Sequence, residues 1–234
     1  MNEWFSQIQA VIFDFDGVLV DSMQHHVDAW QTVFREYGIE LTPQEILERE
    51  GEKARLTTSS IARNHGIELN NDEVERLIRK KRKIYRANAK RRIRPLARVA
   101  VSECRRRGFK TAIVTGSVRD NLEWALAPEE SALFDVIITA DNVCHGKPHP
   151  EPYLSAAEKL GVSPQECLVI ENAPLGIRSA KAAGMKCIAV TTTLSADHLC
   201  EADLILPDLD ALWSGIKASN AGGLSDGSSE NHHD

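Results

Sequence analysis

Short runs of consecutive apolar residues recur along the chain, separated by segments in which apolar residues return every three or four positions. The runs do not alternate with polar residues, which is typical of strands buried on both faces of a sheet. The segments between them, such as 150–160 and 174–183, have the period of amphipathic helices, and Gly184 is placed to end the second. Six strands are predicted: Ala10–Asp14, Lys110–Thr115, Asp135–Thr139, Cys167–Glu171, Lys186–Thr191 and Asp203–Leu206.

Strands and helices that alternate at this spacing predict right-handed crossovers and a parallel sheet with helices on both faces. We therefore expect an α/β protein with a Rossmann-like parallel core.

Residues 20–91 depart from this pattern, because they contain no convincing strand. Two helices are indicated by apolar residues at helical spacing: Val27, Trp30, Phe34 and Tyr37 before Gly38, then Val74, Leu77, Ile78 and Tyr85. A third helix is expected at 56–64. The segment is therefore predicted to be a small helical cap domain (20–91) inserted into a core domain (1–19 and 92–217). The small, polar residues 218–234 predict a disordered tail, for which His232 and His233 are a weak metal signal.

Composition narrows the function classes. A formal charge of −6 argues against general affinity for nucleic acid. No apolar run approaches the ~18 residues of a membrane span, and the first residues lack the pattern of a signal peptide. Five cysteines, with no Cys-x-x-Cys, favour neither a disulfide framework nor a zinc knuckle. We expect a reduced, cytoplasmic protein whose partner is neither nucleic acid nor membrane; nothing in the sequence specifies its oligomeric state.

Two carboxylates follow the first strand at a place where parallel α/β sheets bind ligands. Asp14 and Asp16 are two residues apart, so their side chains point the same way, and Gly17 lets the chain turn past them. The pair repels, and burying it is costly unless a cation compensates. Magnesium is the natural hard cation for such oxygens. The alternative is a simple Asp-Gly turn.

The segment Asp14–Ser22 (DFDGVLVDS) resembles the first motif of the haloacid-dehalogenase superfamily of phosphotransferases. Three further motifs follow in the family's order: a strand ending in Thr115-Gly-Ser, Lys147 in a proline-rich loop, and Glu171-Asn172 after a strand. The resemblance covers about residues 8–213, and the inserted helices correspond to the family's small cap. The chain is similar to the subgroup of β-phosphoglucomutase and phosphoglycolate phosphatase.

The resemblance implies roles for the first and third motifs. Asp14 is expected to be the nucleophile that forms an aspartyl-phosphate, and Asp16 the general acid and base. Lys147 is expected to neutralise charge at the phosphate. The implied cofactor is Mg²⁺, with ligands from Asp14, Asp16, Glu171 and Asn172. Asn172 departs from the family's usual Glu-Asp pair, so weaker metal affinity is expected; the alternative for Asn172 is a helix cap.

The second motif and the cap are expected to hold substrate. Thr115, with the amides of Gly116 and Ser117, is predicted to bind the phosphoryl group, although Ser117–Asp120 also has the form of a helix capping box. In the cap, His26 is either a proton-transfer residue or a surface histidine. Lys80 and Lys81 are candidate substrate contacts within the basic run 79–94, most of which is expected to be a solvated face. Arg55 is left unassigned.

The leading prediction is a magnesium-dependent phosphatase that hydrolyses a small phosphorylated metabolite. A sugar phosphomutase is the runner-up, because it uses the same residues and differs in whether the closed cap excludes water. A binding or regulatory protein that lost the chemistry is the third possibility, suggested by Asn172.

Overall fold

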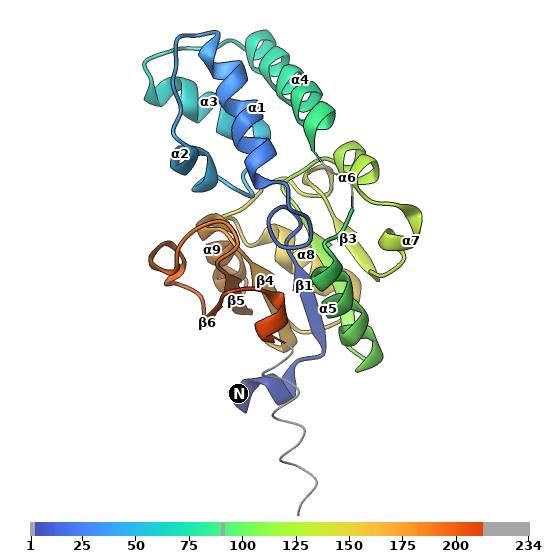
Figure 1. Ribbon diagram of the computed structural model, residues 1–234. Helices are drawn as coiled ribbons and strands as arrows, with labels where there is room; N and C mark the ends of the chain where they lie inside the picture. Colours follow the sequence, from blue (N-terminus) through green and yellow to red (C-terminus); the bar gives the residue numbers. More distant parts are fainter. Residues whose placement is uncertain (1–2, 90–91, 213–234) are drawn as a thin grey trace, which may run out of the picture.

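One sheet of six parallel strands forms the centre of the computed structural model, which describes residues 3–89 and 92–212 (Figure 1). The strand order is β3-β2-β1-β4-β5-β6. In β1, Ile12 lies opposite Ala112 on one side and Val169 on the other. The strands are β1 Ala10–Phe13, β2 Lys110–Val114, β3 Val136–Ile138, β4 Cys167–Glu171, β5 Lys186–Val190 and β6 Leu204–Leu206. The predicted α/β class with a parallel Rossmann-like core is confirmed.

The strand predictions are correct to within one residue at each end. Three of the predicted residues that the strands do not include, Asp14, Thr115 and Thr191, are polar and directly follow the last residue of a strand. They lie at the carboxyl edge, where a parallel sheet presents its ligand site.

Helices lie on both faces of the sheet and in a separate group above its carboxyl edge (Figure 1). The α-helices are α1 Met23–Arg35, α2 Pro43–Leu47, α3 Ala54–Asn64, α4 Asn71–Asn88, α5 Pro95–Arg106, α6 Arg119–Ala125, α7 Pro128–Ser131, α8 Glu151–Leu160 and α9 Pro174–Ala182. Short 3₁₀ turns are η1 Glu3–Gln7, η2 Ala140–Asn142, η3 Pro164–Glu166 and η4 Ala196–Leu199. Among the described residues, no helix has both the length and the apolar character needed to cross a membrane.

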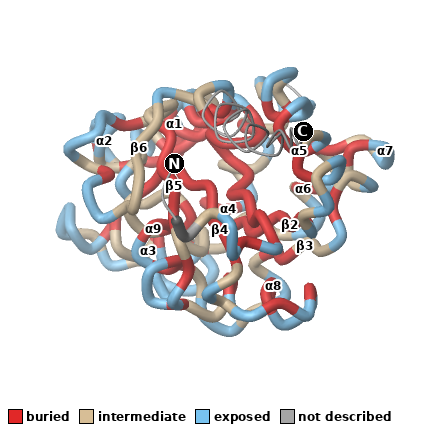
Figure 2. Tube along the Cα trace, turned by 90° about the horizontal axis from the view of Figure 1, so that it is seen from below, coloured by how far each residue is buried: buried red, intermediate tan, exposed pale blue. Residues whose placement is uncertain are grey.

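Alternate residues of each strand enter two separate hydrophobic clusters. Val11 and Phe13 face the cluster that includes α5, whereas Ala10 and Ile12 face the cluster that includes Tyr153 of α8 and residues of α9. Both faces of the sheet are therefore buried, which explains why the strand sequences are apolar without alternation. Figure 2 shows this buried centre within an exposed rim.

A third hydrophobic cluster is formed by helices α1–α4 and the loops between them. Trp30 and Phe34 of α1 pack with Leu77 of α4 and with residues of α2 and α3. The three helices expected from spacing correspond to α1, α3 and α4. Helix α2 was not predicted: it has five residues, and it begins with a capping box at Thr42 rather than with a periodic apolar face. The domain boundaries stay a prediction, and residues 213–234, with the predicted tail, lie outside the described residues.

All five cysteines are within the described residues and all are free thiols. Burial raises the pKa of Cys104, Cys167 and Cys187. This agrees with the expectation that no disulfide framework holds the chain, while the cytoplasmic location stays a prediction.

Candidate active site

Asp14 and Asp16 lie at the carboxyl end of β1, in the middle of the sheet. The amide of Asp14 donates to the carbonyl of Ile170 at 2.9 Å, which fixes its backbone beside β4. Both side chains are buried, with 2% and 3% exposure. Gly17 then turns with φ of 85°, and a Cβ there would lie 2.2 Å from Asn172 Nδ2. Glycine therefore meets two requirements here: it adopts the positive φ, and it leaves room for Asn172 in the loop that follows the neighbouring strand β4.

Lys147 reaches from the loop before α8 to the first of these carboxylates. Its Nζ lies 2.6 Å from Asp14 Oδ1, 2.6 Å from Glu171 Oε1 and 3.3 Å from the carbonyl of Val114. The lysine is buried, and burial lowers its pKa, but the two carboxylates outweigh this and raise the pKa above its usual value. Lys147 is therefore a fixed positive charge beside Asp14.

Glu171 at the end of β4 holds Lys147 in place. Its Oε1 accepts from Lys147 Nζ and, at 2.7 Å, from the hydroxyl of Tyr153. Its Oε2 accepts from the amides of the next two residues, at 2.9 and 3.2 Å. A Cβ at Gly176 would lie 1.7 Å from Oε1, so α9 begins directly against this carboxylate. Both oxygens are thus engaged by the protein; the ligand role expected for Glu171 stays a prediction.

Two buried oxygens in this site have no hydrogen-bond partner: Asp14 Oδ2 and Asn172 Oδ1. The amide nitrogen of Asn172 donates to Thr193 Oγ1 at 2.8 Å, which directs the amide oxygen elsewhere. An unsatisfied buried acceptor costs about 1–3 kcal/mol. A carboxylate and an amide oxygen are also the donors that a hard divalent cation takes. The chemistry of these two atoms therefore fits magnesium.

The raised pKa of Asp14 also supports a divalent cation at this position. Burial raises the pKa of Asp14 to about 8, and the neighbouring carboxylate of Glu171 adds to it, although Lys147 acts in the opposite direction. One lysine is therefore not enough positive charge for a site with this many carboxylates. A divalent cation would supply the remainder and keep Asp14 ionised.

Asp16 is held by a different set of groups. Its Oδ1 accepts from Ser22 Oγ at 2.6 Å and lies 3.0 Å from His26 Nε2. His26 Nδ1 lies 2.5 Å from Lys81 Nζ. A protonated Lys81 only donates, so Nδ1 accepts and Nε2 carries the proton that His26 gives to Asp16. Burial raises the pKa of Asp16, but His26 and Ser22 outweigh it, and the pKa is lowered.

The cap histidine is therefore not a surface residue. His26 is buried, stacks on Tyr85 with ring centroids 4.2 Å apart, and has a pKa lowered by burial and by Lys81. Lys80 forms an ion pair with Glu36 on the cap and is not among the residues that line the cavity, so its role as a substrate contact stays a prediction. Successive helical residues point about 100° apart, so only one of the two lysines faces inward.

The second motif places Thr115, Gly116 and Ser117 beside the aspartates. Thr115 is buried and its Oγ1 accepts from the amide of Ser117 at 3.0 Å. Ser117 Oγ lies 3.5 Å from Asp16 Oδ2. A Cβ at Gly116 would lie 2.6 Å from the carbonyl oxygen of Gly51, so the cap contacts the core here. The phosphate-binding roles of these residues stay predictions.

The capping box expected at Ser117–Asp120 is not formed. Helix α6 begins at Arg119 with Val118 as its cap residue, and no side chain caps it in the usual way. The amide of Arg119 instead donates to Asp141 Oδ2 at 2.6 Å. Because Ser117 is turned toward Asp16, its hydroxyl is not available to the helix start.

A cavity of about 420 Å³ lies between the cap and the core. His26, Lys81, Gly116 and Ser117 line it, as does Glu50 in the loop between α2 and α3. Burial raises the pKa of Glu50 well above its usual value, and Asp16 and Asp14 add to this. Burial also lowers the pKa of Lys81 to about 8. The cavity has the size of a site for a small molecule.

Sequence reasoning did not find Glu50, nor the hydroxyl of Tyr153 that holds Glu171. Glu50 stands before Gly51, where a Cβ would lie 2.6 Å from Lys147 Cδ. A glutamate followed by a glycine, in the loop between α2 and α3, was therefore the sequence signal that could have indicated Glu50. Arg55, left unassigned, lines the same cavity and pairs with Glu75 at its rim.

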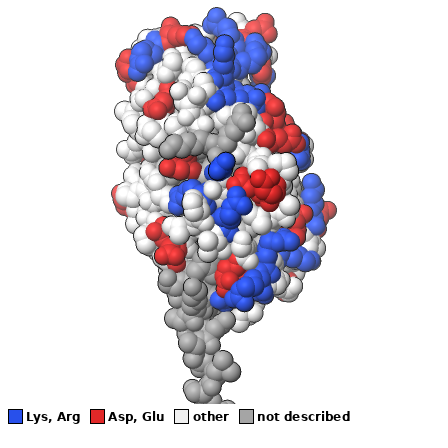
Figure 3. Space-filling model, turned by 45° about the vertical axis from the view of Figure 1, so that its right-hand side comes forward, with Lys and Arg blue, Asp and Glu red and all other residues white. Residues whose placement is uncertain are grey.

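Part of the basic run joins cap to core. Arg86 Nη2 donates to Asp120 Oδ2 at 2.6 Å and to Asn121 Oδ1 at 2.9 Å, both on α6. Lys53, on the cap loop, donates to the carbonyls of Val143 and Cys144. Figure 3 shows Lys and Arg gathered over the cap on one face of the molecule. Arg86 of the basic run 79–94 thus binds the cap to the core. Lys90 and Arg91 of this run lie outside the described residues.

Comparisons with known proteins agree with this architecture. Residues 11–190 match the family model of haloacid dehalogenase-like hydrolases. The validoxylamine A 7'-phosphate phosphatase of Streptomyces hygroscopicus subsp. limoneus is 32% identical over 219 residues, which are 90% of this chain and 99% of that protein. Fructose-1-phosphate phosphatase YqaB of Escherichia coli (strain K12) is 32% identical over 189 residues, 80% of this chain and 98% of that protein.

A solved structure from Bacteroides vulgatus, provisionally named a β-phosphoglucomutase, has a TM-score of 0.80 and 32% identity and covers 91% of this chain, with 90% of its own length matched. Fold and relatives together define an enzyme of phosphate esters: a phosphoric monoester hydrolase, with phosphomutase as the alternative. The chain belongs to the haloacid dehalogenase-like hydrolase family.

Proposed function

We propose that this chain is a magnesium-dependent phosphatase that hydrolyses a small sugar or polyol phosphate through an aspartyl-phosphate on Asp14. One observation carries the proposal: Asp14 is buried at the edge of the sheet with one oxygen on Lys147 and the other without a partner. The two relatives described above are named as phosphatases of validoxylamine A 7'-phosphate and of fructose 1-phosphate, and a further relative, 34% identical over 221 residues, is named hexitol phosphatase A of Escherichia coli (strain K12). These names support a phosphorylated polyhydroxy compound as the substrate class.

Bound magnesium would be held by Asp14 and Asn172, with Asp16 and Glu171 as the further proposed ligands, and would offset the repulsion between anionic substrate and nucleophile. Lys147 neutralises the same region from the protein side. In the first step, Asp14 attacks phosphorus, the bond from phosphorus to the ester oxygen breaks, and Asp16 gives a proton to the leaving oxygen.

In the second step, water attacks the phosphorus of the aspartyl-phosphate. Asp16 takes the proton of that water, and Asp14 leaves as a carboxylate. The lowered pKa of Asp16 suits this base role, because the group is ionised when the water must be activated. The chain from Lys81 through His26 holds Asp16 in position.

The phosphomutase alternative is favoured by the structural likeness to a protein named β-phosphoglucomutase. Both reactions share the first step and differ in the acceptor, which is water or a sugar hydroxyl. A panel of sugar and polyol monophosphates, assayed with Mg²⁺ for released phosphate, separates them. Stoichiometric phosphate release supports hydrolysis. Isomerisation that requires a sugar bisphosphate and releases no phosphate would contradict the proposal.

The Asp14→Asn variant tests whether the chemistry belongs to this site. Loss of phosphate release by at least about 10³-fold is expected, since a nucleophile has been removed. The matched control is Asp21→Asn, an exposed aspartate of the same motif. Equal loss in both variants, or none in either, would argue against a nucleophilic Asp14.

A further inference from the structure

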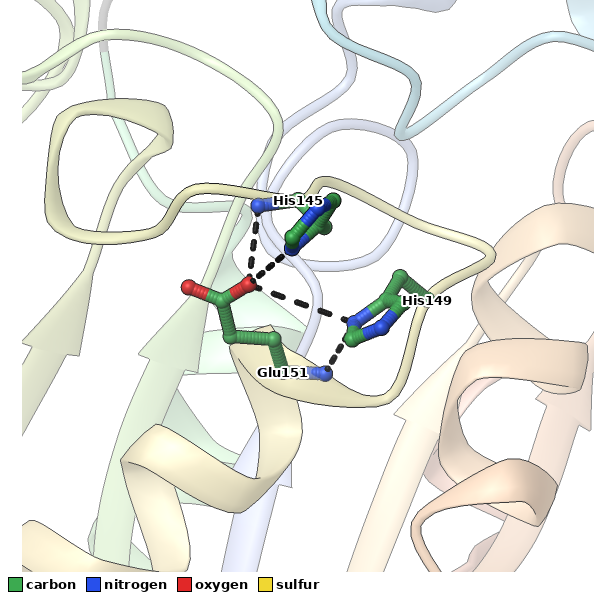
Figure 4. Close-up of side chains that lie close together, drawn as sticks. All are labelled: His145, His149 and Glu151. Carbon is green, nitrogen blue, oxygen red and sulfur yellow. Dashed lines mark hydrogen bonds and ion pairs between the residues drawn. The ribbon is translucent and has the colours of Figure 1, made fainter.

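Two histidines and a glutamate converge beside the active-site loop, outside the machinery described above (Figure 4). His145 and His149 flank Lys147 in the segment between η2 and α8, and Glu151 is the first residue of α8. One ligand atom from each of the three lies within 4.8 Å of the others. Glu151 Oε2 is 2.8 Å from His145 Nδ1 and 4.0 Å from His149 Nδ1.

The protein itself orders this cluster. The carboxylate of Glu151 accepts from the amides of Cys144 and His145, at 2.6 and 2.8 Å. The two imidazole rings lie 4.5 Å apart between centroids. The amide of Glu151 donates to His149 Nδ1 at 3.2 Å, so this nitrogen is unprotonated in the present arrangement. An unprotonated ring nitrogen is the form that binds metals.

Distances in the cluster are close to those of a metal site. Ligand atoms in a tetrahedral zinc site, with bonds of ~2.0–2.1 Å, are about 3.3 Å apart. The pairs at 2.8 and 4.0 Å bracket this value. A bound metal would replace the proton between His145 Nδ1 and Glu151 Oε2, and the side chains of His145 and His149, which are 66% and 50% exposed, have room to adjust to it. The exposed side gives space for a water as a fourth ligand.

We propose that His145, His149 and Glu151 bind a divalent transition metal such as Zn²⁺. Two imidazoles and one carboxylate suit zinc, whereas Mg²⁺ prefers an all-oxygen, octahedral shell. The site is therefore chemically distinct from the magnesium site at Asp14 and Asn172. It spans the turn that carries Lys147, so a bound metal joins the two ends of that turn.

Isothermal titration of the full chain with Zn²⁺, in the presence of excess Mg²⁺, tests the site. Both the reference protein and the variants carry His232→Ala and His233→Ala, so that the C-terminal histidines do not contribute. One Zn²⁺ per chain is expected in the reference. Affinity falls by about tenfold or more in His149→Ala and in Glu151→Gln. The matched control His65→Ala/His198→Ala removes two histidines from other surfaces and leaves the titration unchanged.

Co²⁺ in place of Zn²⁺ gives a second readout, because its visible absorption reports tetrahedral coordination; this absorption is expected in the reference and lost in His149→Ala. Thermal unfolding without metal confirms that each variant is folded. Undiminished Zn²⁺ affinity in His145→Ala/His149→Ala overturns the proposal. So does competition by Mg²⁺, which would place the zinc on the active-site carboxylates, or the absence of any saturable binding.

Discussion

Two buried carboxylates at the end of the same strand have pKa values that are shifted in opposite directions. Asp14 contacts Lys147 from the core, yet its pKa is raised to about 8, chiefly by burial. Asp16, two residues on, contacts His26 from the cap, and its pKa is lowered despite the same burial. Identical side chains thus differ in pKa because of their surroundings, which is the kind of difference that the proposed division between nucleophile and acid–base group requires.

The comparison also separates what the core and the cap supply. In the Asp14 network, the hydrogen-bond partners Lys147 and Glu171 both come from the core, although Gly51 of the cap packs against the Lys147 side chain. The Asp16 network depends on His26 of α1 and Lys81 of α4 and is complete only when the cap lies on the core. The contacts of Asp16, the proposed acid–base group, therefore depend on the closed arrangement, whereas those of Asp14, the proposed nucleophile, come from the core.

Removing Lys147 is the change expected to break the core network most severely. Lys147→Ala leaves Asp14 and Glu171 buried without their cation, which costs about 3–5 kcal/mol of unfolding free energy. Phosphate release falls by at least about 10³-fold, because the charge beside the nucleophile is lost. Chemical denaturation and steady-state kinetics measure the two effects. Lys159→Ala, on the exposed side of α8, is the control, and a Lys147→Ala enzyme as stable and active as that control would refute this role.

Breaking the cap network should have a smaller effect. His26→Gln removes the imidazole between Lys81 and Asp16, and kcat is expected to fall by roughly 10²-fold, the usual scale of acid–base assistance. The unfolding free energy changes less than in Lys147→Ala, because Ser22 still donates to Asp16. His25→Gln, the neighbouring histidine, is the control. Equal kcat in the two variants would show that Asp16 does not depend on the cap.

Asn172 is the residue at which the proposed magnesium site can be tested. Asn172→Asp adds the second carboxylate that related sites use, so the Mg²⁺ concentration for half-maximal activity is expected to fall by about tenfold. Activity measured across a range of Mg²⁺ concentrations gives this value for both proteins. An unchanged magnesium dependence would remove Asn172 from the ligand set.

The smallest expected effect concerns stability and pH. The folded-state pKa of Glu50 is raised well above its usual value, so the folded protein binds a proton at Glu50 that the unfolded chain has released. Stability is therefore lost as pH rises from the usual glutamate pKa through the raised one. Glu50→Gln removes this loss and should raise the melting temperature at neutral pH but not near pH 4. Glu48→Gln, an exposed neighbour, should change neither, and a Glu50→Gln protein that is less stable at pH 7 would contradict the assignment.

Patterns within single segments predicted the fold and the first motif well. The apolar runs identified all six strands, because strands buried on both faces leave a strong local signal. The resemblance also brought together the segment with Asp14 and Asp16 and the distant Lys147. These are features fixed by the sheet, whose geometry is common to the family.

The rest depends on contacts between segments. Which of Lys80 and Lys81 faces the cavity follows from the rotation of α4 about its axis, and the hydroxyl of Ser117 is taken from its helix by Asp16. Glu171 acquires a lysine and a tyrosine as partners only when α8 and the loop before it pack against the sheet. None of these follows from periodicity, because each is a choice between two locally reasonable partners that tertiary packing decides.

The central claim is that Asp14 carries the phosphoryl group, and acid quenching tests it most directly. Enzyme mixed with Mg²⁺ and a ³²P-labelled substrate from the active panel is quenched within the first turnovers, digested, and mapped by mass. The account predicts label on the peptide that contains Asp14, none in Asp14→Asn, and unchanged labelling in Asp21→Asn. Turnover without any labelled enzyme, or label that persists in Asp14→Asn, would contradict it.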